Sequence, residues 1–344
     1  METQPDWKDV LSAARTLDGV AHRTPVLTSR ALDQRSAATV FLKCENFQRT
    51  GSFKFRGALH AVHALAPERR RQGVITHSSG NFAQALALAA RLEETTATVV
   101  MPKDSTPAKI RASQAYGARV VLCEPVQTSR VETTEQEKKK TGATFVDSHD
   151  DPRIIAGQGT VLLELVDEIR SGEDPAEDGS MDPLDVILAP VGGGGLLAGT
   201  AIAAKHLCPS SRIIGCEPAA ADDAFQSLQQ GRRIVDFVPR TIADGLRTPL
   251  GKLNFAVIQR LVHEIITVSE SEIVDAMQWA WERLKIVIEP SSAVALAPLL
   301  AEDSRFKGSR IGVILSGGNV DLDPFFALLR ADLHRGLSQD LRPL

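Results

Sequence analysis

The chain has 344 residues, of which 43% are hydrophobic, and its formal net charge at pH 7 is -4. Such a chain can bury a sizeable core, and its length suits one large domain or two smaller ones. The slightly acidic balance gives no electrostatic reason to expect nucleic acid or an anionic membrane as a partner. No apolar run reaches membrane-spanning length, and the acidic residues Glu2, Asp6 and Asp9 are unlike a signal or transit peptide. We therefore expect a cytoplasmic protein.

The cysteines are widely scattered and form no CxxC pair, which predicts neither a disulfide framework nor a zinc site. We expect all of them to be small buried hydrophobic residues. They are Cys44, Cys123, Cys208 and Cys216. The one basic run, Lys138 to Lys140, lies among glutamates and is expected on a solvated helix face.

Apolar, β-rich runs alternate with helical patterns through most of the chain, which predicts an α/β fold with parallel sheets covered by helices on both faces. The expected strands are Val40–Leu42, Gly73–Thr76, Ala97–Met101, Arg119–Cys123, Asp185–Val191, Arg212–Cys216 and Arg310–Leu315. The expected helices are Phe82–Leu92, Lys109–Tyr116, Ile155–Ile169 and Ser271–Leu284. The acidic segment Ser171 to Pro183 predicts a mobile surface loop, and the chain from Arg335 onward is expected to fray.

The segment Thr50 to Gly57, TGSFKFRG, is the first that could carry chemistry, because it places Lys54 between Phe53 and Phe55. Loss of water disfavours the ammonium form and lowers a lysine pKa, as a Schiff-base lysine requires. The alternative is a surface lysine on the first turn of an amphipathic helix. On this segment alone, the surface lysine would be the preferred interpretation.

An apolar run at Val186 to Val191 leads directly into Gly192, Gly193, Gly194 and Gly195, and then into a helical pattern. Adjacent glycines carry an entropic cost of roughly 0.5–1 kcal/mol each, so some feature should require them. Bare N–H groups at a helix N-terminus form an anion cradle. We favour phosphate binding over a flexible linker, because both flanks are strongly apolar and periodic.

The same glycines allow a rival interpretation. Gly193-x-Gly195-x-x-Ala198 matches the dinucleotide fingerprint, and Glu217 follows about 20 residues later, after a strand. A dinucleotide-binding oxidoreductase leaves Lys54 and the two turns described next unexplained. It is therefore the runner-up.

Two further turns follow apolar strands, THSSGNFAQ at Thr76 to Gln84 and LSGGN at Leu315 to Asn319. Small donors at a helix start suit a carboxylate or another anion. Plain N-capping by Ser78 or Ser79 is the simpler alternative for the first turn. Together with Lys54 and the glycines, these turns predict one site at the carboxyl edge of a sheet.

Taken together, SFKFRG, SSGN, GGGG and SGGN, in this order, resemble the fold-type-II pyridoxal-phosphate (PLP) enzymes, specifically the serine racemase and serine/threonine dehydratase family. IRASQAYGA, IAGQGT, EPAAADD, TIADG and IEPSSAV extend the resemblance over nearly the whole chain. It implies a tryptophan-synthase-β-like fold with two open, mostly parallel twisted sheets. Residues 1–70 and 149–344 would form a large PLP-binding domain, with a small mobile domain, 71–148, inserted.

The resemblance also assigns roles to residues around the cofactor. Lys54 would bind the cofactor aldehyde and remove the substrate Cα proton. The cofactor ring would lie between Phe53 and Gly245, with its phosphate on the amides of Gly192 to Gly195. Asn81 would contact the ring hydroxyl.

Ser316 would contact the pyridine nitrogen, and this assignment influences the reaction. A serine cannot hold that nitrogen protonated as a carboxylate would, which favours prompt loss of a β-leaving group over a long-lived carbanion. The implied reaction removes water from a β-hydroxy amino acid and gives a 2-oxo acid and ammonia. Ser79 aligns with the opposite-face acid/base of the racemase, so a serine racemase with side dehydratase activity is the alternative.

The substrate carboxylate would lie on the SSGN turn, with help from Arg130. The turn comprises Ser78, Ser79, Gly80 and Asn81. Two departures from the family occur here, because SSGNH becomes SSGNF at Phe82 and an HPN-type segment becomes DSHDD around His149. Phe82 could favour an aryl substituent, as in 3-phenylserine, whereas Arg130, His149 and Arg153 could favour a second carboxylate, as in 3-hydroxyaspartate.

A divalent-cation site is implied in GCEPAAADD by the same resemblance. Glu217, Asp223 and the carbonyl of Ala221 would supply oxygen ligands for Mg²⁺, Ca²⁺ or Mn²⁺. The alternative is that Asp222 or Asp223 only caps the following helix. Analogy with the family further implies a homodimer acting on a small amino acid.

Overall fold

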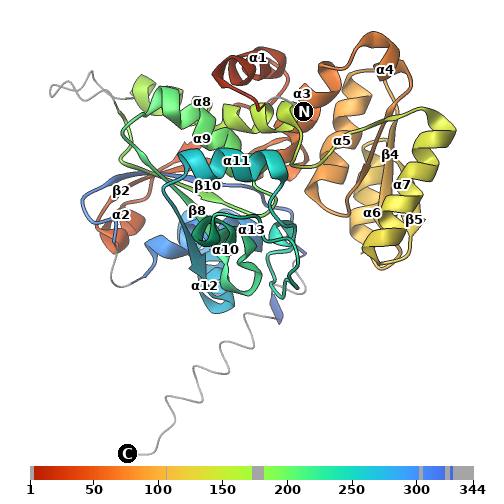
Figure 1. Ribbon diagram of the computed structural model, residues 1–344. Coiled ribbons are helices and arrows are strands. Elements are labelled where there is room, and N and C mark those ends of the chain that lie inside the picture. The colour runs from red at the N-terminus through yellow and green to blue at the C-terminus, as the bar shows by residue number, and fades with distance from the viewer. Residues whose placement is uncertain (1–3, 106, 173–181, 302–304, 322–325, 328–344) are drawn as a thin grey trace, which may run out of the picture.

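The computed structural model describes residues 4–105, 107–172, 182–301, 305–321 and 326–327. Most of the acidic segment predicted as a loop, and the chain beyond Arg335, lie outside these residues. The described chain forms one six-stranded and one four-stranded sheet, which lie in two neighbouring units (Figure 1). None of the described helices is long and apolar enough to cross a membrane.

The six-stranded sheet is parallel except for its short first strand. In spatial order its strands are β1 (Val26–Leu27), β2 (Thr39–Cys44), β10 (Arg310–Leu315), β7 (Val186–Pro190), β8 (Arg212–Pro218) and β9 (Glu264–Val268). Strand β10 pairs on both sides, with Ile311 opposite Val40 of β2 and Val186 of β7. Because β7 and β10 are central, the turns after them come together at one edge of the sheet.

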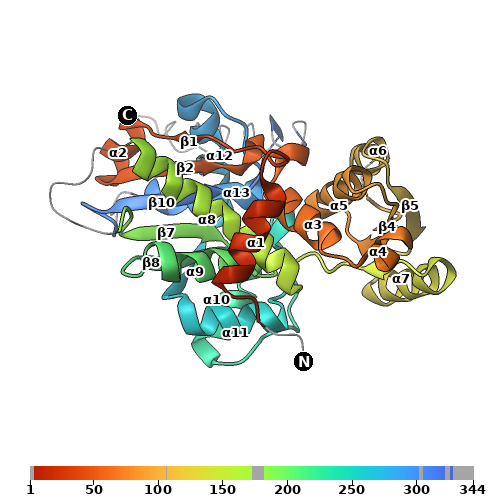
Figure 2. The ribbon, with the colours of Figure 1, turned by 90° about the horizontal axis from the view of Figure 1, so that it is seen from above.

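Helices cover both faces of this sheet, and each face has its own hydrophobic core (Figure 2). One face carries α1 (Trp7–Leu17), α8 (Pro152–Gly172), α9 (Gly195–Leu207) and α11 (Lys252–Leu261). The other carries α2 (Arg30–Ser36), α12 (Glu270–Trp279), which continues as a π-helical turn to Leu284, and α13 (Pro290–Leu296). A sheet buried on both faces explains why its strands are almost continuously apolar rather than alternating.

The four-stranded sheet is entirely parallel. Its order is β5 (Arg119–Cys123), β4 (Ala97–Pro102), β3 (Val74–His77) and β6 (Thr144–Phe145), and its helices are α4 (Pro67–Arg71), α5 (Asn81–Leu92), α6 (Pro107–Ala115) and α7 (Gln127–Thr141). The two sheets confirm the predicted fold class. The strands of this sheet lie within residues 71–148, although the exact domain limits remain a prediction.

The predicted strands all form, and their bounds differ from the prediction by at most two residues. The predicted helices form as well, although α8 begins three residues before Ile155. The cysteines are free and buried, as expected. On α7, Lys138 and Lys140 pair with Glu135 and Glu137, which confirms a solvated helix face.

Helix α3 (Lys54–His63) joins the two units and packs closely against α8 through glycines. A Cβ atom on Gly157 of α8 would lie only 2.5 Å from the Cα atom of Gly57 in α3. The neighbouring Gly199 of α9 approaches α8 in the same way, because a Cβ atom on Gly199 would lie 2.4 Å from the carbonyl oxygen of Ile155. These contacts fix the helix that begins with Lys54 against the large sheet.

Candidate active site

Lys54 is the first residue of α3, and its side chain points back toward the chain that returns from the small sheet. Its Nζ atom donates a hydrogen bond to the carbonyl oxygen of Ser148 at 2.9 Å and lies 5.0 Å from the centroid of the Phe53 ring. Burial lowers the pKa of Lys54 to about 8, although Asp147 and Glu289 act to raise it. The structure therefore places Lys54 in a desolvated setting and not on an open helix face.

The glycine turn connects β7 to α9 and leaves no room for side chains. Gly194, the N-cap of α9, has φ of 92°, a left-handed conformation that favours glycine. A Cβ atom on Gly193 would lie 2.4 Å from Cδ2 of His149, and one on Gly192 would lie 2.8 Å from the Cα atom of Leu246. A flexible linker would not be packed in this way, so the turn is a built cradle at a helix N-terminus.

The cradle is also held from outside. The carbonyl oxygen of Gly193 accepts hydrogen bonds from the Nδ2 atom of Asn254 at 2.7 Å and from the N–H of Gly251 at 3.0 Å. Asn254 is fully buried and also donates to the carbonyl oxygen of His149 at 2.9 Å. Sequence reasoning missed Asn254, because an asparagine inside a helical segment carries no distinguishing signal.

The SSGN turn lies between β3 and α5. Gly80 is the N-cap of α5, and no side chain caps this helix. The Ser78 hydroxyl accepts only a local hydrogen bond, from the N–H of Gly80 at 3.3 Å. The N-capping alternative therefore does not describe this turn, and the hydroxyl of Ser79 is not used as a cap.

Asn81 connects the turn to the large sheet. Its Nδ2 atom donates to both carboxylate oxygens of Glu289, at 2.8 and 3.0 Å, and its Oδ1 atom accepts from Nδ2 of Asn319 at 2.9 Å. Burial raises the pKa of Glu289 to about 7, although the hydrogen bond from Asn81 lowers it. A Cβ atom on Gly317 would lie 2.8 Å from Oε1 of Glu289, so this glycine leaves space for the carboxylate.

The other predicted cofactor residues meet at the same place. The carbonyl oxygen of Ser316, at the end of β10, accepts from the N–H of Phe53 at 3.0 Å. The N–H of Gly245 donates to Oγ of Ser291 at 2.9 Å. Gly245 and the glycine turn are neighbours, because the virtual Cβ of Gly192 lies 3.3 Å from the carbonyl oxygen of Gly245. Residues far apart in the sequence thus line one site at the carboxyl ends of β7 and β10.

The DSHDD segment enters this site between β6 and α8. His149 lies against Gly193 and is 17% exposed, and its Nδ1 atom is 3.1 Å from Oδ1 of Asp147. Asp150 leaves the site and instead caps α11, where its carboxylate accepts the N–H groups of Lys252 and Leu253. The sequence flagged this segment as unusual but gave Asp147 no role.

Arg130 of α7 has a guanidinium group available for a ligand. The Nε atom of Arg130 is buried. Within the described residues, Nε has no hydrogen-bond partner and the guanidinium group forms no ion pair. Burial, and then the charge of Arg130, lower the pKa of His77 at the end of β3, so Arg130 lies near the carboxyl end of that strand. By contrast, Arg153 is bound to the carboxylate of Asp151, with Nε 3.0 Å from Oδ1.

The residues predicted to bind a metal lie elsewhere, at the end of β8 and the start of α10 (Asp223–Gln230). Glu217, Ala221 and Asp223 are all buried. Glu217 caps α10, because its two oxygens accept the N–H groups of Ala224 and Phe225 at 3.0 and 2.8 Å. Asp222 is the N-cap residue by position but makes no side-chain cap, so the capping side chain is Glu217, which is not free to bind a ribose as the dinucleotide interpretation requires.

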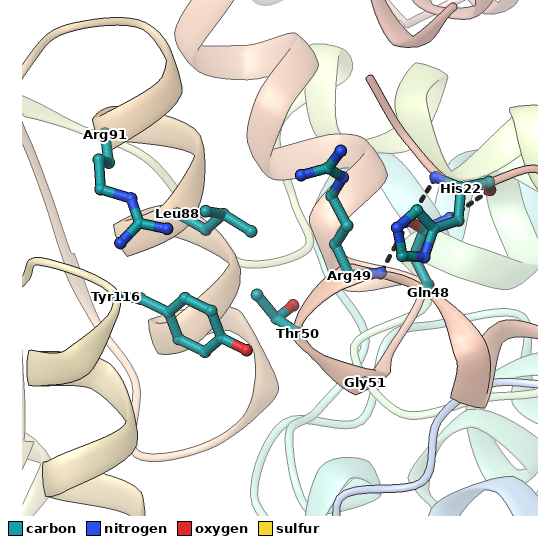
Figure 3. A pocket seen from close by; sticks show the side chains of 8 residues that line it. All are labelled: His22, Gln48, Arg49, Thr50, Gly51, Leu88, Arg91 and Tyr116. Carbon is teal, nitrogen blue, oxygen red and sulfur yellow. Dashed lines mark hydrogen bonds between the residues drawn. The ribbon is translucent and has the colours of Figure 1, made fainter. Parts of the chain in front are cut away.

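A separate cavity of about 440 Å³ lies behind the site, between α5 and the loop that precedes Lys54 (Figure 3). It is lined by His22, Gln48, Arg49, Thr50, Gly51, Leu88, Arg91 and Tyr116. None of the residues predicted for the cofactor or substrate lines this cavity, although Thr50 and Gly51 of its lining contact Asn319.

Comparison with known proteins identifies the group to which the chain belongs. Residues 17–317 match the family described as pyridoxal-phosphate dependent enzymes. The chain is 44% identical to β-hydroxyaspartate dehydratase of Paracoccus denitrificans, over 93% of this chain and 98% of that protein. It is 40% identical to serine racemase of Schizosaccharomyces pombe, over 93% and 96% of the two chains.

Among solved structures, serine racemase from Dictyostelium discoideum is similar, with a TM-score of 0.85 and 40% identity over 93% of this chain and 100% of that chain. The match confirms the predicted resemblance, and no dinucleotide-binding oxidoreductase is needed to explain the glycine turn. The buried amine of Lys54 and the packed glycine turn fit a cofactor that carries an aldehyde and a phosphate. The chain therefore belongs to the pyridoxal-phosphate dependent enzymes, in the fold-type-II group that includes hydroxyaspartate ammonia-lyases and serine racemases.

Proposed function

We propose that this enzyme eliminates water from 3-hydroxyaspartate, and that hydrolysis of the resulting imine takes up one water and releases ammonia and a 2-oxo acid. Bound pyridoxal phosphate supplies the electron withdrawal that makes the substrate Cα–H bond acidic. The relative from Paracoccus denitrificans, named for the same substrate, supports the proposal. The single observation in this chain that carries it is Arg130, whose buried Nε atom has no hydrogen-bond partner among the described residues and whose charge acts on His77 at the end of β3.

Lys54 would act as the base at the substrate Cα atom. A primary amine is a competent base at neutral pH only if its pKa is lowered, and burial lowers the pKa of Lys54 to about 8. The carbonyl of Ser148 holds the amine at 2.9 Å and limits its positions. Phe53 would cover one face of the cofactor ring and Gly245 the other, with Gly192 to Gly195 holding the phosphate.

3-Hydroxyaspartate has two carboxylates, and the site offers two groups that can bind an anion. The amides and hydroxyls of the SSGN turn suit the α-carboxylate. Arg130 offers a planar fork of donors that suits the β-carboxylate. Phe82 is 2% exposed and belongs to the core of the small sheet, and its ring centroid lies 6.0 Å from Nζ of Lys54, so the competing aryl substrate is tested directly in the assay below.

The primary test is a keto-acid assay with the stereoisomers of 3-hydroxyaspartate, serine, threonine and phenylserine. We expect the highest kcat/KM with one isomer of 3-hydroxyaspartate. In Lys54→Ala we expect no measurable turnover and an unchanged circular dichroism spectrum. Substantial elimination by this variant would remove Lys54 from the catalytic role.

A second test addresses Arg130. In Arg130→Ala we expect kcat/KM for 3-hydroxyaspartate to fall about 10–100-fold more than kcat/KM for serine, because a charge-assisted hydrogen bond contributes about 1.5–3 kcal/mol. Lys139→Ala, which removes an exposed cation from the same helix, is the matched control. Equal losses with both substrates would contradict the assignment of the β-carboxylate.

Racemisation is a second candidate activity. It is supported by similarity to serine racemases and by Ser79, whose hydroxyl lies in the SSGN turn and caps no helix. If Ser79 reprotonates Cα from the face opposite Lys54, Ser79→Ala should abolish racemisation and retain elimination. Chiral chromatography of serine after incubation separates the two activities.

We also propose a divalent-cation site at Glu217, Asp223 and the carbonyl of Ala221. The described residues contain no cluster of three metal-ligating side chains. Two observations support the proposal. Oδ1 of Asp223 is buried and has no hydrogen-bond partner among the described residues. Burial raises the pKa of Glu217, and the nearby charge of Asp223 raises it further. Two carboxylates and a carbonyl suit Mg²⁺, Ca²⁺ or Mn²⁺. The cation would neutralise two buried negative charges. We expect EDTA to lower the Tm and Mg²⁺ to restore it, with Asp223→Asn insensitive to both.

A homodimer in the cytoplasm is proposed from family analogy alone.

A further inference from the structure

His149 lies between the amine of Lys54 and the glycine turn. The carbonyl of the preceding residue, Ser148, accepts the hydrogen bond from Nζ of Lys54 at 2.9 Å. The imidazole itself packs against Gly193, whose virtual Cβ would lie 2.4 Å from Cδ2 of the ring. The His149 side chain therefore lines the site between Lys54 and Gly193, both of which are assigned to the cofactor.

One side of the imidazole faces a carboxylate and a hydroxyl group, because Nδ1 also lies 3.1 Å from Oγ of Ser148. The Nδ1 atom lies 3.1 Å from Oδ1 of Asp147, and this oxygen also accepts the N–H groups of His149 and Asp150, both at 2.9 Å. Burial by itself would raise the pKa of Asp147, but the hydrogen bond and charge of His149 and the two N–H groups outweigh it, and the pKa is lowered. Asp147 is thus a fixed anion beside the ring.

The other ring nitrogen is available. Nε2 is bonded to Cδ2, the atom next to Gly193, and has no hydrogen-bond partner in the part of the chain that the structure describes. An imidazole held at Nδ1 by a carboxylate presents Nε2 for proton transfer, and the carboxylate stabilises the cationic form. This arrangement leaves Nε2 as the ring atom that can donate a proton.

Elimination of water needs such an acid, because hydroxide leaves poorly without a proton. Other groups around the site are less suited. Both oxygens of Glu289 accept from Asn81, the ring of His77 packs against Phe145 with centroids 5.3 Å apart, and the hydroxyl of Ser79 is a weak acid.

We propose that His149, oriented by Asp147, donates the Nε2 proton to the departing β-hydroxyl group, an inference that rests on the proposed elimination. Lys54 removes the Cα proton, the electron pair of the Cα–H bond becomes the Cα–Cβ π bond, and the Cβ–O bond breaks. The oxygen leaves with the electrons of that bond, takes the proton from Nε2 and departs as water.

The test compares leaving groups in His149→Asn. Chloride needs no proton, so elimination from β-chloroalanine bypasses the acid. We expect kcat with the hydroxy substrate to fall about 10²–10⁴-fold and kcat with β-chloroalanine to fall less than about tenfold. Equal losses with the two substrates, or no loss with either, would show that His149 does not protonate the leaving group and would overturn the proposal.

A second measurement is independent of turnover. In the 15N-histidine NMR spectrum of the full-length protein, we expect the Nδ1 atom of His149 to carry a proton that faces Asp147, and Asp147→Asn to remove this preference for protonation at Nδ1. Ser148→Ala is the matched control, because the Ser148 hydroxyl lies at the same 3.1 Å from Nδ1 and should leave the ring unaffected. A neutral ring protonated at Nε2, with Nδ1 accepting from Ser148, would reject the pair.

These outcomes are distinguishable from failure of the proposed function. If the wild-type enzyme does not act on 3-hydroxyaspartate but eliminates water from serine, the substrate assignment fails and the leaving-group comparison is made with serine. Equilibrium dialysis of pyridoxal phosphate against His149→Asn separates loss of acid catalysis from loss of cofactor, since the backbone of His149 is held by Asn254 in either case.

Discussion

Individual side chains in this site are kept in unusual states by burial. Glu289 is 3% exposed, and its pKa of about 7 means that it binds a proton more readily in the folded chain than in the unfolded chain. Ionising it therefore opposes folding. The groups that favour its ionised form are the amide of Asn81, the backbone N–H of Asn319 and the charge of Lys109.

The first prediction follows from Glu289. A carboxyl group whose pKa is raised on folding contributes its full stability below its ordinary pKa of 4.5, and this is lost as the pH rises through about 7. Relative to Glu289→Gln, which cannot ionise, the wild-type apoprotein should lose up to about 3 kcal/mol of unfolding free energy between pH 5 and pH 8. Urea unfolding at several pH values measures the difference. Glu282→Gln, at an exposed position, should show no such pH-dependent difference.

Sequence reasoning located the residues whose type is dictated by backbone or cofactor chemistry. Lys54 and Gly192 to Gly195 belong to motifs with few alternative explanations once taken together. It gave no roles to Asn254, Asp147 or Glu289, because each acts through a contact with a residue distant in the chain. Glu289 lies in the IEPSSAV segment that supported the resemblance, so its motif was visible but its partner was not.

At the scale of elements, the position of Lys54 depends on how closely three helices approach one another. Where α3, α8 and α9 cross, the contact positions are glycines, because a side chain there would overlap the neighbouring helix: Gly57, Gly157 and Gly199. Strand positions were predictable from apolar runs, but these crossings were not, because a glycine within a helical pattern does not reveal what it faces. The same limit applies to α8, which was predicted too short at both ends.

The second prediction concerns these crossings. Gly157→Ala would place a Cβ atom 2.5 Å from the Cα atom of Gly57, so backbone must move. We expect a loss of about 1–3 kcal/mol of unfolding free energy and weaker binding of pyridoxal phosphate, because α3 carries Lys54. The control is Gly172→Ala at the end of the same helix, where nothing lies within 4 Å of the new methyl group. Similar stability of the two variants would show that α3 and α8 are not held by this contact.

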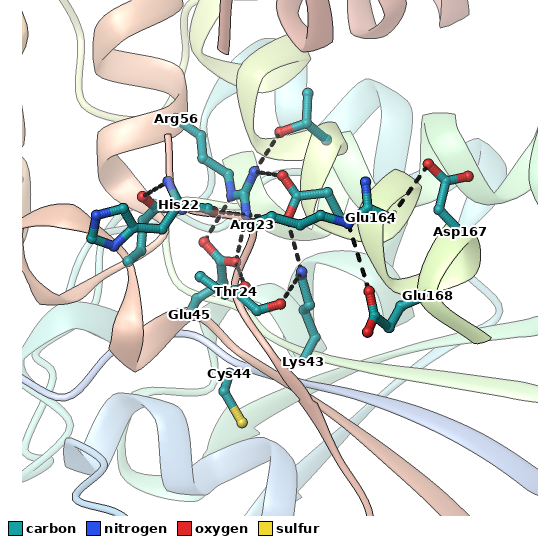
Figure 4. A network of polar contacts seen from close by, with 12 residues as sticks. His22, Arg23, Thr24, Lys43, Cys44, Glu45, Arg56, Glu164, Asp167 and Glu168 are labelled. Carbon is teal, nitrogen blue, oxygen red and sulfur yellow. Dashed lines mark hydrogen bonds and ion pairs between the residues drawn. The ribbon is translucent and has the colours of Figure 1, made fainter. Parts of the chain in front are cut away.

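At the scale of the whole molecule, a buried ionic cluster joins β2 and the loop after it to α3 and α8 (Figure 4). Arg56 contacts Glu45 at 2.7 Å and Glu164 at 2.6 Å, and Lys43 contacts Glu164 at 2.7 Å. Two cations and two anions balance one another, with Thr24 supplying further hydrogen bonds. The cluster ties the N-terminal part of the large unit to the helix that begins with Lys54.

The third prediction tests this cluster. Arg56→Met retains most of the side-chain volume but leaves Glu45 and Glu164 without their shared partner. Removing one partner of a buried pair destabilises a protein by about 3–5 kcal/mol. Lys103→Met breaks the exposed pair with Glu124 and should change the unfolding free energy by less than about 1 kcal/mol. Thermal unfolding of the two variants measures the difference. Equally small losses in both would show that the buried cluster does not stabilise the fold.

The insertion of the small sheet has a mechanical consequence. The chain leaves the large unit through α3 and returns through the segment that contains Ser148, and these two crossings touch where Nζ of Lys54 meets the Ser148 carbonyl. We expect any rotation of the small sheet about these two connections to pivot close to this amine. Such a rotation would have to break the hydrogen bonds from Asn81 to Glu289, and the reactive nitrogen would keep its place while the SSGN turn moves.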